Sequence, residues 1–158
     1  MNAEASSFDP DSFLDATTTE ALVKRPPLPV GDYVATIQEV KSRAWTSQKP
    51  EAKIKAGIAV DIVLKIDLSA YPEAQKVTNG DSSQLRTSVM LDLNDGGSID
   101  WSQGRNGALR RYREALDMNK AGEAFSIRQM QGRLIRVKIK HRTYEGELYD
   151  EVDSVAKA

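Results

Sequence analysis

Residues 58–68 read IAVDIVLKIDL, and this stretch decides the fold class. Every second residue from Ile58 to Leu68 is apolar, and charged residues at positions 61, 65 and 67 lie between them. Successive side chains of a β-strand point to opposite faces, so this alternation predicts a strand with one buried and one solvated face. The sequence therefore predicts a mainly β protein.

Two more strands are predicted, one on either side of this one. Residues 32–45, DYVATIQEVKSRAW, are rich in β-branched side chains, and residues 85–93 place Leu, Thr and Val on one face. A lysine-rich loop at residues 47–55 separates the first two strands. Residues 71–84 are expected to form a long polar connection before the third strand.

The C-terminal half of the chain predicts one helix and two strands. Leu109, Tyr112 and Leu116 lie at helical spacing within residues 105–119, which indicates an amphipathic helix. The two strands are expected over residues 134–142 and 147–156. The order strand, strand, strand, helix, strand, strand is that of an OB-fold, a five-stranded barrel. We therefore expect residues 31–158 to form one OB-type barrel.

Residues 1–30 are expected to form an extended, acidic N-terminal arm. This segment contains Thr, Asp and Pro residues, and its five acidic residues all precede its first basic residue, Lys24. Phe8, Phe13 and Leu14 are the apolar exceptions. They are expected to dock the arm onto the barrel or onto a partner protein.

Length and composition narrow the class of protein. At 158 residues the chain suits one domain, and its 40% hydrophobic and 28% charged residues are typical of a folded protein. It contains no cysteine, which excludes disulfides and thiolate zinc sites and fits a reducing compartment. The N-terminal segment lacks a basic and apolar leader, and no apolar run approaches the ~20 residues of a membrane span. A cytoplasmic protein without a membrane partner is expected.

The charge distribution favours an anionic partner, although the formal net charge is only −1. Residues 101–142 carry eleven basic residues against three acidic ones, whereas both ends of the chain are acidic. A local excess of positive charge is the electrostatic signature of nucleic-acid binding.

The strand expected at residues 134–142 carries a row of cations. Because side chains alternate across a strand, these cations lie on one face about 7 Å apart, close to the spacing of phosphates along an extended single strand. The row consists of Arg136, Lys138, Lys140 and Arg142. The alternative is a solvated face, on which Glu147 and Glu151 of the next strand supply the opposite charge.

Aromatic residues accompany the cations in the loops that OB-folds use for oligonucleotides. Trp45 lies in the first loop, and Tyr144 follows Arg142 in the loop between the last two strands. Aromatic rings stack on bases while cations follow the phosphates. The basic residues around Trp45 are Lys41, Arg43, Lys49, Lys53 and Lys55. Either aromatic residue could instead be a core residue or a loop anchor.

Arginines on the predicted helix are additional candidates for phosphate contacts. Their planar guanidinium groups can donate two hydrogen bonds to one phosphate. These residues are Arg105, Arg110, Arg111 and Arg113. A solvated amphipathic helix explains them equally well. Trp101, just before the helix, is expected to be a packing residue.

The sequence predicts no catalytic residue, metal site or cofactor. His141 is the only histidine, and a single histidine in an alternating strand is usually a packed residue. Asp92, Asp95 and Asp100 could surround a divalent cation, but their segment, DLNDGGSID, is more typical of a turn. The sequence contains neither a phosphate-binding glycine loop nor a nucleophile elbow. A binding protein is expected, and a metal-dependent nuclease is the weaker alternative.

Several stretches resemble a group of small tailed-phage proteins. They are FDPDSFLDA, PPLPVGDYVATIQEV, MLDLNDGGSIDWSQGRNGALRRYREALDMN and QGRLIRVKIKHRTYEGELYDEVDSV. Such proteins are usually encoded among phage replication and recombination genes. The resemblance implies an OB-fold protein that binds single-stranded DNA.

The residues and the resemblance together predict a non-catalytic protein that coats single-stranded DNA without strong base preference. It would act during phage replication or recombination, in the host cytoplasm. Phage or host replication and recombination proteins, and further copies of the chain, are candidate partners. The alternative is a protein-interaction module, an adaptor in such a complex, in which the arm binds another protein and the basic residues are only solvated.

Overall fold

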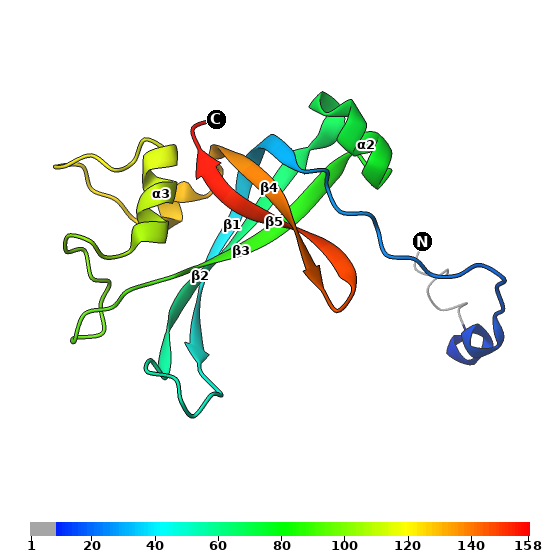
Figure 1. Cartoon of the computed structure of the whole chain (residues 1–158), viewed down its shortest axis with the longest axis horizontal. Helices are drawn as coiled ribbons and strands as arrows, with labels where there is room; N and C mark the ends of the chain where they lie inside the picture. The colour runs from blue at the N-terminus through cyan, green and yellow to red at the C-terminus, as the bar shows by residue number, and fades with distance from the viewer. Residues whose placement is uncertain (1–8) are drawn as a thin grey trace.

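The computed structural model describes residues 9–158 and shows a twisted antiparallel sheet of five strands in the order β3-β2-β1-β4-β5 (Figure 1). The strands are β1 (Gly31–Thr46), β2 (Ala56–Asp67), β3 (Ser82–Met90), β4 (Leu134–Tyr144) and β5 (Glu147–Ala156). Each strand predicted from the sequence is present. The prediction of a mainly β protein is therefore confirmed.

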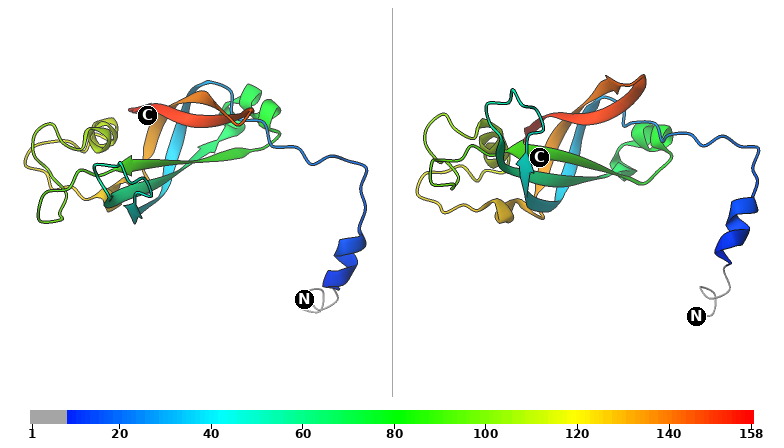
Figure 2. Two further views of the ribbon diagram at one scale, coloured as in Figure 1. Left: turned by 60° about the horizontal axis from the view of Figure 1, so that its bottom comes forward. Right: turned by 90° about the horizontal axis from the view of Figure 1, so that it is seen from below.

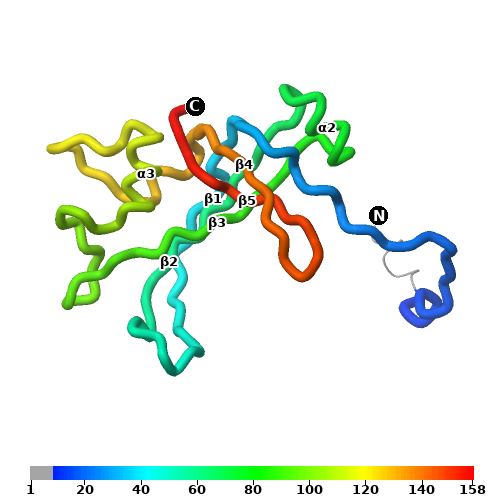
Figure 3. The backbone as a smooth tube through the Cα atoms, in the orientation of Figure 1, coloured from blue at the N-terminus to red at the C-terminus, as the bar shows by residue number. Residues whose placement is uncertain are grey.

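The central strand, β1, pairs with both halves of the sheet. Its residues 36–46 pair with β2, and its residues 31–36 pair with β4. A bulge between Ile37 and Glu39 shifts the register of the β1–β2 pair. Bulges bend a strand and increase its twist. Strand β2 stays paired with β3 as far as Ala59, and beyond that residue β1 and β2 continue as a hairpin that projects from the rest of the sheet (Figure 3).

One face of the sheet forms the core. In β2, Val60, Ile62, Leu64 and Ile66 are buried. Lys65 and Asp67, whose side chains point to the other face, are exposed. The predicted division of β2 into a buried and a solvated face is therefore confirmed. The large side chains that are fully buried include Leu28, Ile37, Ile62, Leu64, Ile66, Leu68, Leu109, Met130, Ile135 and Ile139.

The connection between β2 and β3 contains helices that the sequence analysis did not predict. A short 3-10 helix (Leu68–Ala70) is followed by α2 (Pro72–Thr78), which buries Ala74 and Thr78. Proline suits the first turn of a helix, and Asn79 ends α2 in the left-handed conformation with φ 52°. The expected polar connection is therefore wrong over residues 72–78, where proline and asparagine are helix caps.

Strand β3 lies three residues earlier than predicted: it begins at Ser82, inside the expected polar connection, and ends at Met90 rather than at position 93. The Leu91 N–H still donates to the Ile58 carbonyl, at 3.0 Å, and Leu93 forms an isolated bridge with Ile99. The following segment is a turn, as expected: the Asn94 carboxamide oxygen accepts hydrogen bonds from the Gly96 and Ser98 N–H groups.

The predicted amphipathic helix is confirmed as α3 (Gly107–Ala115), which buries Leu109 and Tyr112. It ends at Ala115, before the expected Asn119, because Asp117 adopts a φ of 58° that an α-helix cannot contain.

The start of α3 is fixed to the segment after β3 by a buried polar side chain. The Asn106 carboxamide donates to the Asp92 and Asp100 carbonyls, at 3.0 and 2.8 Å, and accepts from the Asp92 N–H at 2.8 Å. Buried polar groups of this kind require partners, so the three bonds hold α3 in one position.

The sheet is open. Strands β3 and β5 are its two edges, and the described residues contain no ladder between them. A small cleft of about 150 Å³ lies beside α3 and is lined by both edge strands, among others by Val89, Tyr112 and Val155. The predicted order of elements along the chain is correct apart from α2. Closure into a barrel is not confirmed.

Residues 24–30, which we call the clasp, pack against the β4–β5 hairpin. Leu28 is fully buried; its N–H donates to the Asp150 carboxylate at 2.7 Å, and His141 Nε2 donates to its carbonyl at 2.6 Å. The Lys24 ammonium lies 3.7 Å from the centre of the Tyr149 ring. The clasp was expected to belong to the arm, but its contacts join it to the sheet.

The arm before the clasp extends away from the sheet (Figure 2). It contains a 3-10 helix, η1 (Pro10–Asp15), in which Phe13 and Leu14 are 63% and 83% exposed. These two residues are not buried against the sheet, and Phe8 lies outside the described residues. None of the described helices is long and apolar enough to cross a membrane.

Candidate nucleic-acid interface

The predicted binding residues fall into three groups: the β1–β2 hairpin, the β4–β5 hairpin and the region of α3. The two hairpins project from the same side of the sheet in Figure 1. In an OB-fold, oligonucleotides lie on strands 2 and 3 between these two hairpin loops. We therefore call the solvated surface of β2 and β3, together with the two hairpins, the hairpin face.

Trp45 lies on the β1–β2 hairpin opposite Gly57 of β2. A Cβ atom at position 57 would lie only 2.9 Å from the indole, so the ring system packs directly over the glycine backbone. The indole Nε1 is buried and has no hydrogen-bond partner among the described residues. Packing alone therefore holds this ring, and the side chain as a whole is only partly buried.

Arg43 is part of a polar network on the same hairpin. Its guanidinium donates to both carboxylate oxygens of Asp61, at 2.8 and 3.2 Å, and the Ser88 hydroxyl donates to Asp61 at 2.6 Å. The hydrogen bond from Arg43, followed by that from Ser88, lowers the pKa of Asp61. Much of the positive charge of Arg43 is balanced by this carboxylate.

The lysines of the β1–β2 hairpin differ in their surroundings. Lys41 forms an ion pair with Glu39 at 3.1 Å, and Lys55 donates to the Pro50 carbonyl at 2.5 Å within the loop. Lys49 and Lys53 are exposed and form no ion pair within the described part of the chain. The loop tip therefore offers two cations that an incoming phosphate could pair with directly.

The cation row of β4 is half neutralised. Lys140 lies 3.4 Å from Asp153 and 3.5 Å from Glu151, and Arg142 lies 3.1 Å from Glu151. The hydrogen bond to Asp153, followed by that to Glu151, raises the pKa of Lys140.

The other two cations of the row, Arg136 and Lys138, form no ion pair with the described residues. The solvated-face alternative therefore holds for half of the row. Glu147 was expected to supply opposite charge to the cations of the row together with Glu151. Its carboxylate instead accepts a hydrogen bond from the Tyr149 hydroxyl at 3.1 Å.

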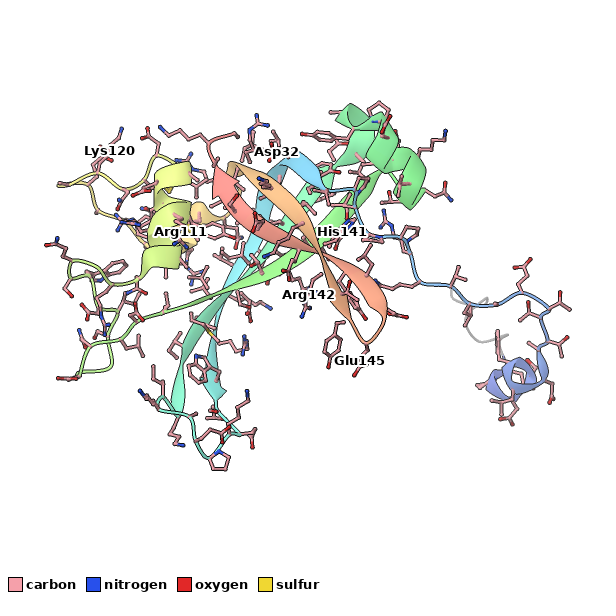
Figure 4. All side chains as sticks on the ribbon, viewed as in Figure 1. Asp32, Arg111, Lys120, His141, Arg142 and Glu145 are labelled. Atoms are coloured by element: carbon pink, nitrogen blue, oxygen red, sulfur yellow. The ribbon has the colours of Figure 1, made fainter. Side chains whose placement is uncertain are left out.

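Tyr144 lies at the tip of the β4–β5 hairpin. The two-residue turn that follows has positive φ at both Glu145 and Gly146, which is the type I′ geometry that twists with its strands. Tyr144 is 55% exposed, and the Arg142 guanidinium lies 5.8 Å from the centre of its ring. Figure 4 shows Arg142 and Glu145 at this hairpin, well separated from Arg111 on α3.

The arginines near α3 do not join the hairpin face. Arg105 pairs with Asp100 at 3.2 Å, and Arg110 pairs with Glu114 at 3.7 Å. Arg113 lies over the Phe125 ring at 4.2 Å and donates to the Met118 carbonyl.

Arg111 lines the small cleft between β3 and β5, and it has no ion pair with any described residue. Trp101 packs edge-on against Phe125, with ring centres 6.5 Å apart, but it keeps 56% of its surface exposed. The expected packing contact of Trp101 is present, although the residue is not buried.

Three residues of the hairpin face were missed by the sequence analysis. Lys65 of β2 and Arg86 of β3 are exposed, and Met90 at the end of β3 is 55% exposed opposite Ala59. The alternation of β2 and of β3 could have identified them, because they occupy the positions between the apolar residues of these two strands.

No group of three or more metal-binding side chains occurs within residues 9–158. Two of the three aspartates of the turn have hydrogen-bond partners in the chain: Asp92 accepts from the Asn106 N–H at 2.7 Å, and Asp100 accepts from the Ser102 hydroxyl at 2.5 Å. No family model matches the sequence, and no curated protein matches it.

Proposed function

We propose that this protein binds single-stranded DNA on the hairpin face of an OB-type sheet, without strong base preference. The observation that carries the proposal is the pairing of an at least partly exposed aromatic residue with cations on each of two hairpins that project from the same side. Trp45 accompanies Lys49 and Lys53 on one hairpin, and Tyr144 accompanies Arg142 on the other. Such a surface suits a strand whose bases stack on rings while its phosphates follow cations.

The ion pairs on this face are compatible with the proposal. Exposed ion pairs contribute little, because water screens them and the side chains lose conformational freedom. A polyanion releases condensed counterions when it binds, which supplies a driving force that isolated carboxylates lack. We therefore infer that phosphates displace Glu151 and Asp153 from Lys140 and Arg142.

The biological role that we propose is the coating of single-stranded DNA during phage replication or recombination. The proposal contains no catalytic step, metal or cofactor. The resemblance to small tailed-phage proteins supports this role, and the order of strands around α3 supports an OB-type architecture.

Titration of a fluorescent oligothymidylate with the full chain tests the proposal. We expect binding that is tighter than to a duplex of equal length and that weakens with salt. The double variant Lys49→Glu/Lys53→Glu should lose most of the affinity. The double variant Arg105→Glu/Arg110→Glu, near α3 and outside the hairpin face, changes the net charge by the same amount and should bind like wild type. Equal losses in both would reject the hairpin face as the binding site.

A protein-interaction module is the second candidate function. It is favoured by the exposed apolar side chains of η1 and by an open apolar groove beside Trp101. Absence of oligonucleotide binding under low-salt conditions would favour this candidate.

A further inference from the structure

An apolar groove lies at the base of the β1–β2 hairpin, where it is lined by the apolar residues Ile58 and Val60 of β2. Its volume is about 490 Å³, within the range of small-ligand sites. Its lining includes Trp101, Phe125 and Ile127 from the segments that flank α3, together with Ile58 of β2 and Leu91. We call this cavity the Trp101 groove. It is large enough to accept one or two apolar side chains from another segment.

The charges at the Trp101 groove favour an acidic occupant. Among the described residues that line it, only Lys41 and Arg128 are charged, and both are cationic. Lys41 already pairs with Glu39, whereas Arg128 is exposed and forms no ion pair with a described residue. Arg113 adds a further positive charge 5.8 Å from the centre of the Trp101 ring.

The arm of the same chain has matching properties. Residues 9–23 contain four acidic residues and no basic one. Within this segment, η1 presents Leu14 at 83% exposure beside Phe13 at 63%. Asp9 caps η1 by accepting a hydrogen bond from the Asp11 N–H at 3.1 Å, so the apolar pair is displayed on a short ordered turn. An apolar pair flanked by carboxylates fits an apolar groove rimmed by cations.

The position of the arm favours binding to another molecule. The clasp fixes Lys24 to the β4–β5 hairpin, where its ammonium donates to the Leu148 carbonyl. In the views of Figures 1 and 2, the arm leaves from one end of the protein, while α3 and its flanking loops, which carry Trp101 and Phe125, lie at the other. The groove of the same chain thus lies on the opposite side from the arm.

We propose that η1 of one copy binds the Trp101 groove of a second copy. Because the two contact surfaces differ, the association is head-to-tail and can continue from copy to copy. This self-association uses neither Trp45 nor Tyr144, so it does not depend on the proposed nucleic-acid binding.

Sedimentation of the full chain without DNA tests the proposal. We expect the mean mass to rise with concentration. Leu14→Asp should weaken association roughly ten- to a hundredfold, as expected when a buried leucine contact is lost. Leu22→Asp adds the same charge to the arm outside η1 and should associate like wild type. A wild-type chain that stays monomeric, or equal effects of the two variants, would overturn the proposal.

A mixing experiment tests the head-to-tail geometry. Arg128→Glu should also prevent growth, because it reverses the exposed charge at the groove. Equimolar Leu14→Asp and Arg128→Glu chains should form one-to-one pairs that grow no further, since one supplies an intact groove and the other an intact arm. Failure to form such pairs, with both variants melting like wild type, would contradict the arm-to-groove contact.

A paramagnetic label separates binding to a second copy from binding within one chain. Because the chain lacks cysteine, Thr17→Cys gives a single labelling site next to η1. Labelled chains should broaden the amide signals of Phe125 and Ile127 in separate ¹⁵N-labelled chains. Broadening only when spin label and isotope are in the same chain would refute the proposed second copy.

Discussion

The indole of Trp45 packs over Gly57, its cross-strand neighbour, so closely that a Cβ there would lie 2.9 Å from the ring. Aromatic side chains often cover a glycine on the neighbouring strand and thereby protect its backbone. In this protein the same contact holds a partly exposed ring on the hairpin face. Gly57 therefore sets the orientation of the residue that we expect to stack on bases.

The first prediction concerns this pair. Trp45→Ala should weaken oligothymidylate binding roughly five- to more than a hundredfold, since stacking is worth about 1–3 kcal/mol per base. Gly57→Ala should weaken binding in the same direction although the indole remains, because the added methyl group displaces it. Tryptophan quenching in a Trp101→Phe background reports Trp45 alone. A Trp45→Ala protein that melts like wild type and binds equally well would show that Trp45 is not a stacking residue.

The second prediction concerns the carboxylate that competes with phosphates. Glu151→Gln removes a partner of both Lys140 and Arg142, so affinity at low salt should rise about two- to fivefold. Glu114→Gln, which removes the partner of Arg110 on α3, is the matched control and should leave affinity unchanged. If both variants gain equally, the effect reflects net charge rather than the β4 row.

The third prediction is the salt dependence of binding. With about three to five phosphate contacts, log K against log salt should have a slope of about −2 to −3.5 for a single strand. Lys138→Ala should make the slope shallower by about 0.7 to 1, because one contact is lost. Anisotropy titrations over a salt series measure both slopes. A wild-type affinity that is independent of salt would contradict phosphate binding.

The fourth prediction concerns alkaline stability. Burial raises the pKa of Tyr112 to about 12, whereas the unfolded chain titrates near 10. A raised folded-state pKa stabilises the protein fully below pH 10, and this contribution is lost as the pH rises from about 10 to 12. Between pH 10 and 12, the free energy of unfolding of Tyr112→Phe should therefore fall by about 3 kcal/mol less than that of wild type. Urea unfolding at a series of pH values measures this difference. If the free energies of unfolding of the two proteins change equally with pH, burial does not keep the Tyr112 hydroxyl neutral.

The fifth prediction concerns the clasp. Leu28→Ala should cost about 2–5 kcal/mol, because Leu28 is fully buried in the core. Deletion of residues 1–23 should leave the melting temperature almost unchanged, since residues 9–23 are all exposed. Thermal unfolding followed by circular dichroism compares the two. A large loss on deletion would mean that the arm, and not the clasp alone, stabilises the sheet.

Much of the sheet could be predicted because each strand has its own local pattern. The alternation in residues 58–68 predicts a strand with one buried face, and in the structure its apolar positions from Val60 to Leu68 are buried. Helix α2 could not be recognised in the same way, because Pro72 and Asn79 are typical of both turns and helix ends. Leu28 carried no periodic signal, since it stands between prolines in a segment without regular structure.

The sequence could predict which residues form the candidate site, but it could not predict which of their charges are paired. The residues on the two hairpins follow from the positions of the loops. The pairing of Lys140 with Asp153 depends on a register shift between Lys138 and Ile139 in the β4–β5 pair. A bulge of this kind depends on three-dimensional pairing, so the sequence could not show which cations are balanced.

The central position of β1 has a consequence for synthesis of the chain. Its partner β4 begins roughly 90 residues after β1 ends, an interval that takes a ribosome about 5–18 s at typical rates of elongation. During this time residues 31–36 of β1 present an unpaired strand edge, although β2 and β3 are already available. Such edges recruit other chains, so premature aggregation on polysomes is the hazard for this topology. Slowing growth by lowering the temperature should raise the soluble yield more than stabilising the finished fold would.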